Sequence, residues 1–284
     1  MKGANLYQSI MEVSFEELSG PGRVLSCLGL ATVFVLSLYA VDAGLSRNHP
    51  KTVRRRLSAI TFVCSISPFY LWLCSDSHVA QGSPHLLYVL GVRSLGLFPA
   101  VVLSLLLVVV LYIGPIFQSL SEGDTLFDHI INGRTDLNFR TYIFAPFAEE
   151  LVFRACMLPV LVPWLGGSWS VAVCPLFFGL AHIHHIMEWR RRRDGTPFIH
   201  ALLVILIQFC YTSVFGMFSA YLFVRTGHLA SPVVSHALCN AMGFPSFESI
   251  PSHPYKRSVG VAYILGLLCF LALLRPLTDP AIFT

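Results

Sequence analysis

Long apolar runs separated by short polar stretches dominate the hydrophobic pattern of this chain. Five of these runs approach or exceed the roughly 18–20 residues that a helix needs to cross a hydrocarbon core of about 30 Å. Because that core offers no water to pair with the backbone, each run is predicted to be an α-helix. The pattern therefore predicts an all-α, polytopic transmembrane bundle. The five runs are 24–45, 59–74, 94–117, 198–224 and 258–274.

Polar residues interrupt two further apolar segments, 141–162 and 230–246, and make them weaker hydropathy peaks. Ionisable side chains inside a span are costly, so we expect the chemistry of the protein there, around a polar cavity within the bundle. We predict one integral membrane domain over residues 1–284. Its spans, about eight in number, are 23–45, 58–75, 94–117, 141–162, 169–186, 198–224, 230–246 and 258–275.

Composition supports the membrane assignment. Charged residues make up 12% of the chain and apolar residues 55%, and the mean hydropathy is +0.69. A soluble globular domain carries about twice that share of charge, so this class is excluded. The first 20 residues include Glu12, Glu16 and Glu17 and lack a basic segment followed by a short apolar one, so we expect no cleavable signal peptide.

The positive charges are distributed unevenly between the two ends of the predicted bundle. Thirteen of the 19 Lys and Arg residues fall in the loops after the first, third, fifth and seventh spans. Basic loops stay in the cytosol, so this bias places both ends of the chain on the opposite side. The run Arg190–Arg193 is either a solvated charge run or a site for anionic lipid head groups.

Two adjacent glutamates and an arginine form the first unusual cluster inside a span. Glu150 and Arg154 are four positions apart, so they share a helix face and are predicted to form an ion pair. Glu149 is rotated by roughly 100° from Glu150 around the helix, so it cannot pair with Arg154 in the same way and is left for another role. Pro146 suits a helix start or kink just before them. The alternative is that all three residues only hold helices together.

Histidines and an asparagine form the other two clusters. His182 and His185 are three positions apart on one helix face, near the end of an apolar span, and are either catalytic or interfacial. His236 and Asn240 share a face at a spacing of four, so both can converge on one point. Two neutral donors at one point suit an oxyanion hole. The alternative is a hydrogen-bonded contact between helices in lipid.

Metal and serine chemistry fit this sequence less well. His182, His185, His236 and Glu149 are residue types that bind zinc. However, the chain has no HExxH helix, no Cys/His cluster at finger spacing and no CxxC pair among its eight cysteines. A GxSxG motif is also absent. We therefore predict no metal and no cofactor, and a metal-dependent membrane peptidase stays as an alternative.

At these residues the chain resembles the type II CAAX prenyl endopeptidases, within the wider family of CAAX proteases and bacteriocin-processing enzymes. That family has EExxxR, FxxxH and HxxxN blocks on successive membrane helices. The resemblance covers roughly residues 125–250 by motif. In this sequence the blocks occur in order as Glu149-Glu150-x-x-x-Arg154, Phe178-x-x-x-His182 and His236-x-x-x-Asn240.

The resemblance implies an intramembrane glutamate peptidase that removes the last three residues of a prenylated protein ending in Cys-a-a-X. It implies that Glu149 and His182 activate a water molecule, and that His236 and Asn240 stabilise the tetrahedral oxyanion. As the general base, Glu149 is expected to need a raised pKa, which burial supplies. The residues expected to support these catalytic groups are Glu150, Arg154 and His185, with Glu150 and Arg154 holding the geometry of the site.

The same resemblance implies the partners and the location. The substrates are farnesylated or geranylgeranylated CaaX proteins such as Ras-like small GTPases, whose prenyl chain enters the lipid bilayer. No nucleic acid is expected to bind. The implied location is the endoplasmic reticulum membrane, with an active site accessible from the cytosol. The non-enzymatic alternative is a scaffold or transporter with a polar relay, although the sequence shows no inverted repeat.

Overall fold

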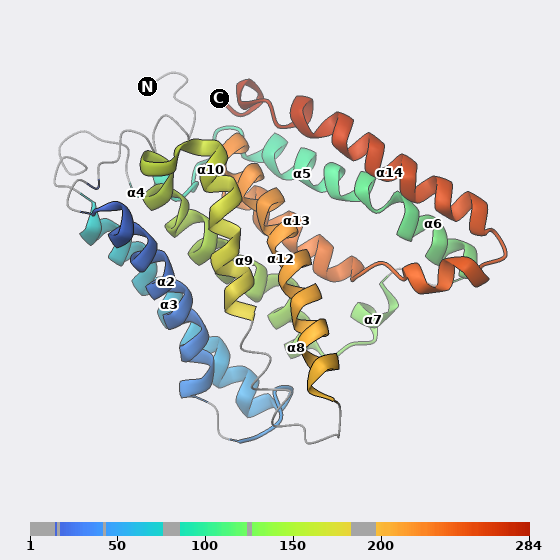
Figure 1. The fold of residues 1–284 in the computed structure, drawn as a ribbon, viewed down its shortest axis with the longest axis horizontal. Helices are drawn as coiled ribbons and strands as arrows, with labels where there is room; N and C mark the ends of the chain where they lie inside the picture. The colour runs from blue at the N-terminus through green and yellow to red at the C-terminus, as the bar shows by residue number, and fades with distance from the viewer. Residues whose placement is uncertain (1–14, 16–17, 42–43, 76–85, 124–126, 183–196) are drawn as a thin grey trace.

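The computed structural model describes residues 15, 18–41, 44–75, 86–123, 127–182 and 197–284, and all regular secondary structure within them is helical (Figure 1). The predicted all-α class is confirmed. In chain order the elements are α2 (Gly20–Ala40), α3 (Pro50–Cys74), α4 (Leu86–Val89), α5 (Leu97–Leu111), α6 (Ile113–Glu122), α7 (Asp128–Ile131), α8 (Thr135–Phe139), η2 (Arg140–Phe144), α9 (Ala145–Glu150), η3 (Leu151–Cys156), α10 (Leu158–Ala181), α12 (Phe198–Thr226), α13 (Ala230–Met242), η5 (Phe247–Ser252), α14 (Lys256–Leu277) and η6 (Pro280–Phe283).

The helices within the described ranges that are long and apolar enough to cross a membrane number five, namely α2, α3, α10, α12 and α14. The pair α5 and α6, bent by 60° at Tyr112, makes a sixth if counted as one span. The multi-spanning class is therefore confirmed, and the predicted number of eight is not. The segment predicted as 230–246 forms the 13-residue α13, which is too short to span a bilayer alone.

Gly166 divides α10 into two helical pieces. Its φ of 74° and ψ of 166° lie outside the helical region and favour glycine, although no atom lies within 4 Å of where a Cβ would be. The first piece continues the helical path that starts at Thr135, and the second leads to Ala181. Figure 1 shows the path reversing direction around α10. This reversal falls between the predicted spans 141–162 and 169–186.

The main apolar core surrounds η3. Phe153, Cys156 and Met157 are at most 1% exposed and belong to one buried cluster with residues of α2, α3, α10 and α12. A smaller cluster of Leu107, Leu222 and Phe270 joins α5, α12 and α14. The segment that carries Arg154 is thus enclosed by apolar helices on several sides.

Two basic connections lie against each other at one end of the bundle. Arg134 Nη1 donates to Asn48 O at 2.8 Å, and Arg140 Nη1 donates to Asn48 Oδ1 at 3.2 Å. The loop after α2 and the segment leading into η2 are therefore on the same side, as the charge distribution predicts. The run Arg190–Arg193 lies outside the described residues.

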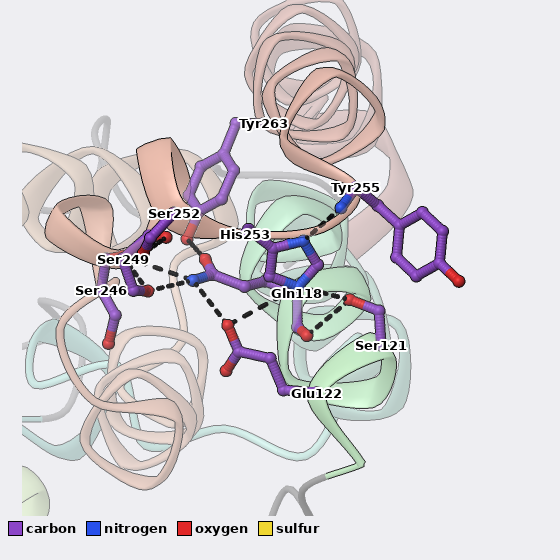
Figure 2. A network of polar contacts seen from close by, with 9 residues as sticks. All are labelled: Gln118, Ser121, Glu122, Ser246, Ser249, Ser252, His253, Tyr255 and Tyr263. Carbon is purple, nitrogen blue, oxygen red and sulfur yellow. Dashed lines mark hydrogen bonds and ion pairs between the residues drawn. The ribbon is translucent and has the colours of Figure 1, made fainter.

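A polar network anchors the connection that follows α13 (Figure 2). Gln118 of α6, which is 3% exposed, donates to Ser249 Oγ at 2.6 Å and accepts from the Tyr263 hydroxyl of α14 at 2.8 Å. His253 Nδ1 accepts from the Tyr255 backbone N–H at 2.9 Å, so in the neutral ring Nε2 carries the proton, 3.1 Å from Ser121 Oγ. The network therefore joins α6, α14 and the segment after α13.

Candidate functional site

Two π-helical segments flank the short helix that carries the adjacent glutamates. Helix α9 has six residues and lies between η2 and η3. A π turn releases a backbone carbonyl from the α-helical pattern, and such turns recur at functional sites. Here the Phe153 carbonyl accepts from Cys174 Sγ at 2.9 Å. The local backbone thus departs from regular α-helix on both sides of Glu149 and Glu150.

Glu150 is fully buried and engages both of its carboxylate oxygens. Oε2 lies 3.2 Å from Arg154 Nε and accepts a hydrogen bond from Ser219 Oγ. Oε1 lies 2.7 Å from His236 Nδ1. The predicted ion pair between Glu150 and Arg154 is present, with both side chains 0% exposed. Glu150 therefore connects α9 to η3, α12 and α13.

Ser219 is a residue of this cluster that sequence reasoning missed. It is 0% exposed on α12 and contacts Glu150 across 69 positions of chain. The available signal was a set of small residues, Ser213, Gly216 and Ser219, repeated every three positions in an otherwise apolar helix. Small residues at such spacing favour close packing between membrane helices.

Arg154 occupies a slot between an aromatic ring and a glycine. Its guanidinium carbon lies 4.4 Å from the centroid of Phe178, in cation–π contact. A Cβ on Gly216 would lie 3.0 Å from Arg154 Nη2 and 2.8 Å from Pro175 Cβ. Nη1 and Nη2 have no hydrogen-bond partner among the described residues, so Glu150 and Phe178 provide the electrostatic support.

The slot predicts the effect of a single methyl group. Gly216→Ala is expected to lower the free energy of unfolding by about 1–3 kcal/mol, because overpacking displaces Pro175 or Arg154. The measurement is the thermal unfolding midpoint in detergent. The control is Gly260→Ala in α14, where nothing lies within 4 Å of the new Cβ and no loss of stability is expected. Equal unfolding midpoints for the two variants would contradict close packing of Pro175 and Arg154 against Gly216.

His236 lies between the two glutamates. Nδ1 is 2.7 Å from Glu150 Oε1, and Nε2 is 3.7 Å from Glu149 Oε2. The ring packs edge-on against Phe215, with centroids 4.8 Å apart. Because a carboxylate only accepts, the Glu150 contact assigns a proton to Nδ1. Nε2 is then an acceptor in the neutral ring and a donor only in the imidazolium.

Asn240 shares the helix face of His236, as predicted, but its side chain has a different partner. Its Nδ2 donates to the Thr141 carbonyl of η2 at 3.0 Å. A spacing of four residues sets the two side chains roughly 6 Å apart along α13, so His236 meets α9 and Asn240 meets η2. The oxyanion hole stays a prediction, with one N–H of Asn240 bonded to the backbone and His236 Nδ1 bonded to Glu150.

His182 lies at the end of α10 and is connected to the cluster through Phe178. Its Nδ1 is 2.8 Å from the Phe178 carbonyl, so Nδ1 carries the proton and Nε2 has the lone pair in the neutral ring. The Phe178 ring centroid is 4.6 Å from that of His182 and 6.3 Å from that of His236. His185 lies outside the described residues. Among the residues that are described, no three His, Cys, Asp or Glu side chains are arranged to hold a metal ion.

Comparison with known proteins relates this cluster to one family. Residues 137–242, which include the whole cluster from Thr141 to Asn240, match the family described as "Type II CAAX prenyl endopeptidase Rce1-like". The chain is similar to "CAAX prenyl protease 2" of Homo sapiens, with 42% identity over 93% of this chain and 85% of that protein. It is 29% identical to the Arabidopsis thaliana protein of the same name, over 96% of this chain and 94% of that protein. No solved structure gives a significant match.

Proposed function

The chain belongs to the type II CAAX prenyl endopeptidases and is a membrane peptidase, and on that premise we propose that it removes the last three residues of prenylated CaaX proteins. The mechanism rests on a series of contacts between side chains. Glu149 faces His236, His236 contacts Glu150, and Glu150 pairs with Arg154. These contacts bring two carboxylates, an imidazole and a guanidinium group together inside an apolar bundle.

Glu149 is the proposed general base. Its side chain is 22% exposed, whereas that of Glu150 is fully buried and engaged on both oxygens. A water molecule can therefore reach Glu149 but not Glu150. His182 is the proposed second residue that orients this water. Proton transfer by a positioned side chain contributes about 10²–10⁴-fold to the rate of such reactions.

His236 and Asn240 are the proposed oxyanion donors. Because Nδ1 of His236 donates to Glu150, Nε2 donates to the oxyanion only when the ring is an imidazolium. Arg154 and Ser219 keep Glu150 in place as the acceptor of that Nδ1 hydrogen bond. The second N–H of the Asn240 amide is the other donor. Donors fixed in position before the reaction stabilise the charge that develops in the transition state.

The proposed reaction is hydrolysis of the peptide bond after the prenylated cysteine. The water oxygen attacks the carbonyl carbon while Glu149 takes one water proton. The carbonyl oxygen becomes the oxyanion beside His236 and Asn240. The carbon–nitrogen bond then breaks, and Glu149 returns the proton to the leaving amine. The products are a C-terminal prenylcysteine and the tripeptide aaX.

A prenylated substrate fits a site inside a membrane bundle, since the isoprenoid chain partitions into lipid while the protein body stays in water. In the proposed orientation the body is cytosolic, because the basic connections around Asn48, Arg134 and Arg140 lie at the end from which η2 leads to Glu149. Ras-like small GTPases are the proposed substrates, and the endoplasmic reticulum membrane is the proposed location.

The test is cleavage of a farnesylated CaaX peptide by the purified chain in nanodiscs, with the unprenylated peptide as control. Release of aaX from the farnesylated peptide alone is expected, and we expect it to persist in EDTA and 1,10-phenanthroline. Loss of cleavage in the chelators, with recovery on addition of zinc, would identify a metal-dependent peptidase. A folded chain that cleaves neither peptide would favour a scaffold or transporter.

A further inference from the structure

A groove opens between α2 and α3 at the basic end of the bundle. Its volume is about 730 Å³. Arginine and serine side chains line it together with apolar ones. The α2–α3 groove is defined by Ser37 of α2, by Val41 directly after α2, and by Arg54, Arg55, Ser58 and Phe62 of α3.

The groove carries positive charge from two arginines that have no acidic neighbour in the surrounding sequence. Arg54 and Arg55 are exposed, and neither guanidinium group has a hydrogen bond or ion pair within the described part of the chain. The surrounding sequence from 47 to 56 contains five Lys or Arg residues and no Asp or Glu. The two serines already donate to their own helices, Ser37 to Phe34 O and Ser58 to Arg54 O. The two guanidinium groups are therefore the donors available to a ligand.

The apolar part of the groove continues along the membrane helices. Phe62 lies two turns beyond Arg54 on the same face of α3 and is 67% exposed. Val41, which directly follows α2, lines the other side of the groove. Because α2 and α3 are candidate membrane spans and Arg54 lies in the second turn of α3, we expect the groove to cross the boundary between head groups and acyl chains. It presents cations at the water side and apolar surface toward the bilayer.

We propose that the α2–α3 groove binds an anionic glycerophospholipid. The lipid phosphate and acidic head group lie against Arg54 and Arg55, and an acyl chain lies along Phe62. Guanidinium groups bind phosphate oxygens with paired, charge-assisted hydrogen bonds. Basic residues just outside a membrane helix attract anionic lipids of the cytoplasmic leaflet. The opposite, buried face of α3 contributes Ile60 and Val63 to the core, so this site is separate from the glutamate cluster.

Native mass spectrometry of the full chain in detergent tests the proposal, with dioleoylphosphatidylserine and dioleoylphosphatidylcholine as probes. The wild-type chain is expected to prefer phosphatidylserine. The variant Arg54→Gln/Arg55→Gln is expected to weaken phosphatidylserine binding roughly 25-fold, about fivefold for each arginine. Phe62→Ala is expected to weaken it about fivefold through lost acyl contact while leaving the charge unchanged.

The matched control is Lys256→Gln/Arg257→Gln, which removes two exposed charges from the first turn of α14, outside the groove. It is expected to change phosphatidylserine binding less than twofold. Equal weakening in both double variants would show a general surface potential and overturn the site. Equal binding of the two lipids by the wild-type chain would also overturn it. Displacement of the lipid by equimolar inorganic phosphate would identify a phosphate site instead of a lipid site.

Discussion

Replacement of Glu149 by glutamine is expected to lower kcat for a farnesylated peptide by roughly 10³-fold, within the range for loss of a general base. Glutamine keeps the size of the side chain and can still face His236 Nε2, which lies 3.7 Å from the Glu149 carboxylate. It cannot accept a proton from water at neutral pH. The measurement is steady-state release of aaX, with KM determined separately, because loss of the base alone leaves substrate binding nearly unchanged.

Glu248→Gln is the matched control for this prediction. Glu248 is exposed in η5, so the same change of charge there is expected to leave kcat within about twofold of the wild-type value. The thermal unfolding midpoints of both variants establish that they are folded. Normal turnover in a folded Glu149→Gln variant would exclude Glu149 as the base.

Glu150→Ala is expected to lower the free energy of unfolding by about 3–5 kcal/mol, because it leaves the guanidinium of Arg154 buried without its counter-ion. Glu149→Gln, one residue away on a partly exposed side chain, is expected to lower it by less than about 1 kcal/mol. Unfolding in mixed dodecyl maltoside and SDS micelles measures both. Stability equal to that of the wild-type chain in Glu150→Ala would contradict a structural role for the ion pair.

A double variant separates the structural role of Glu150 from its effect on activity. Glu150→Gln/Arg154→Met removes both charges, so it is expected to be more stable than Glu150→Ala. It is still expected to be inactive, because His236 then lacks the carboxylate that holds its Nδ1 proton. If the double variant recovers both stability and turnover, Glu150 does not position His236.

The parts of this site that follow from helical periodicity could be predicted from the sequence. The Glu150–Arg154 pair needs only a spacing of four within one helical segment, and it forms even though Arg154 lies in a π-helical stretch. The shared face of His236 and Asn240 follows in the same way. The membrane-spanning helical class follows from apolar runs whose length matches the bilayer.

Contacts between helices could not be predicted from the same patterns. The approach of His236 to Glu150 joins positions 86 residues apart and depends on how α13 packs against α9. The bond from Asn240 to Thr141 spans 99 residues. Periodicity specifies the face of a helix and not its neighbour, so the partners of these side chains required the packed structure. The predicted count of eight spans is not confirmed for a related reason, since the hydropathy pattern does not reveal that α13 has only 13 residues.

The local pairing of Glu150 with Arg154 has a consequence for how the chain is made. Ser219 and His236 are synthesised 69 and 86 residues after Glu150, so neither exists when this segment first reaches the membrane. Arg154 follows after only four residues and neutralises the carboxylate within the same helix. The nascent segment can therefore enter the bilayer as an overall neutral pair at this position. The later helices α12 and α13 then dock onto a carboxylate that is already in place.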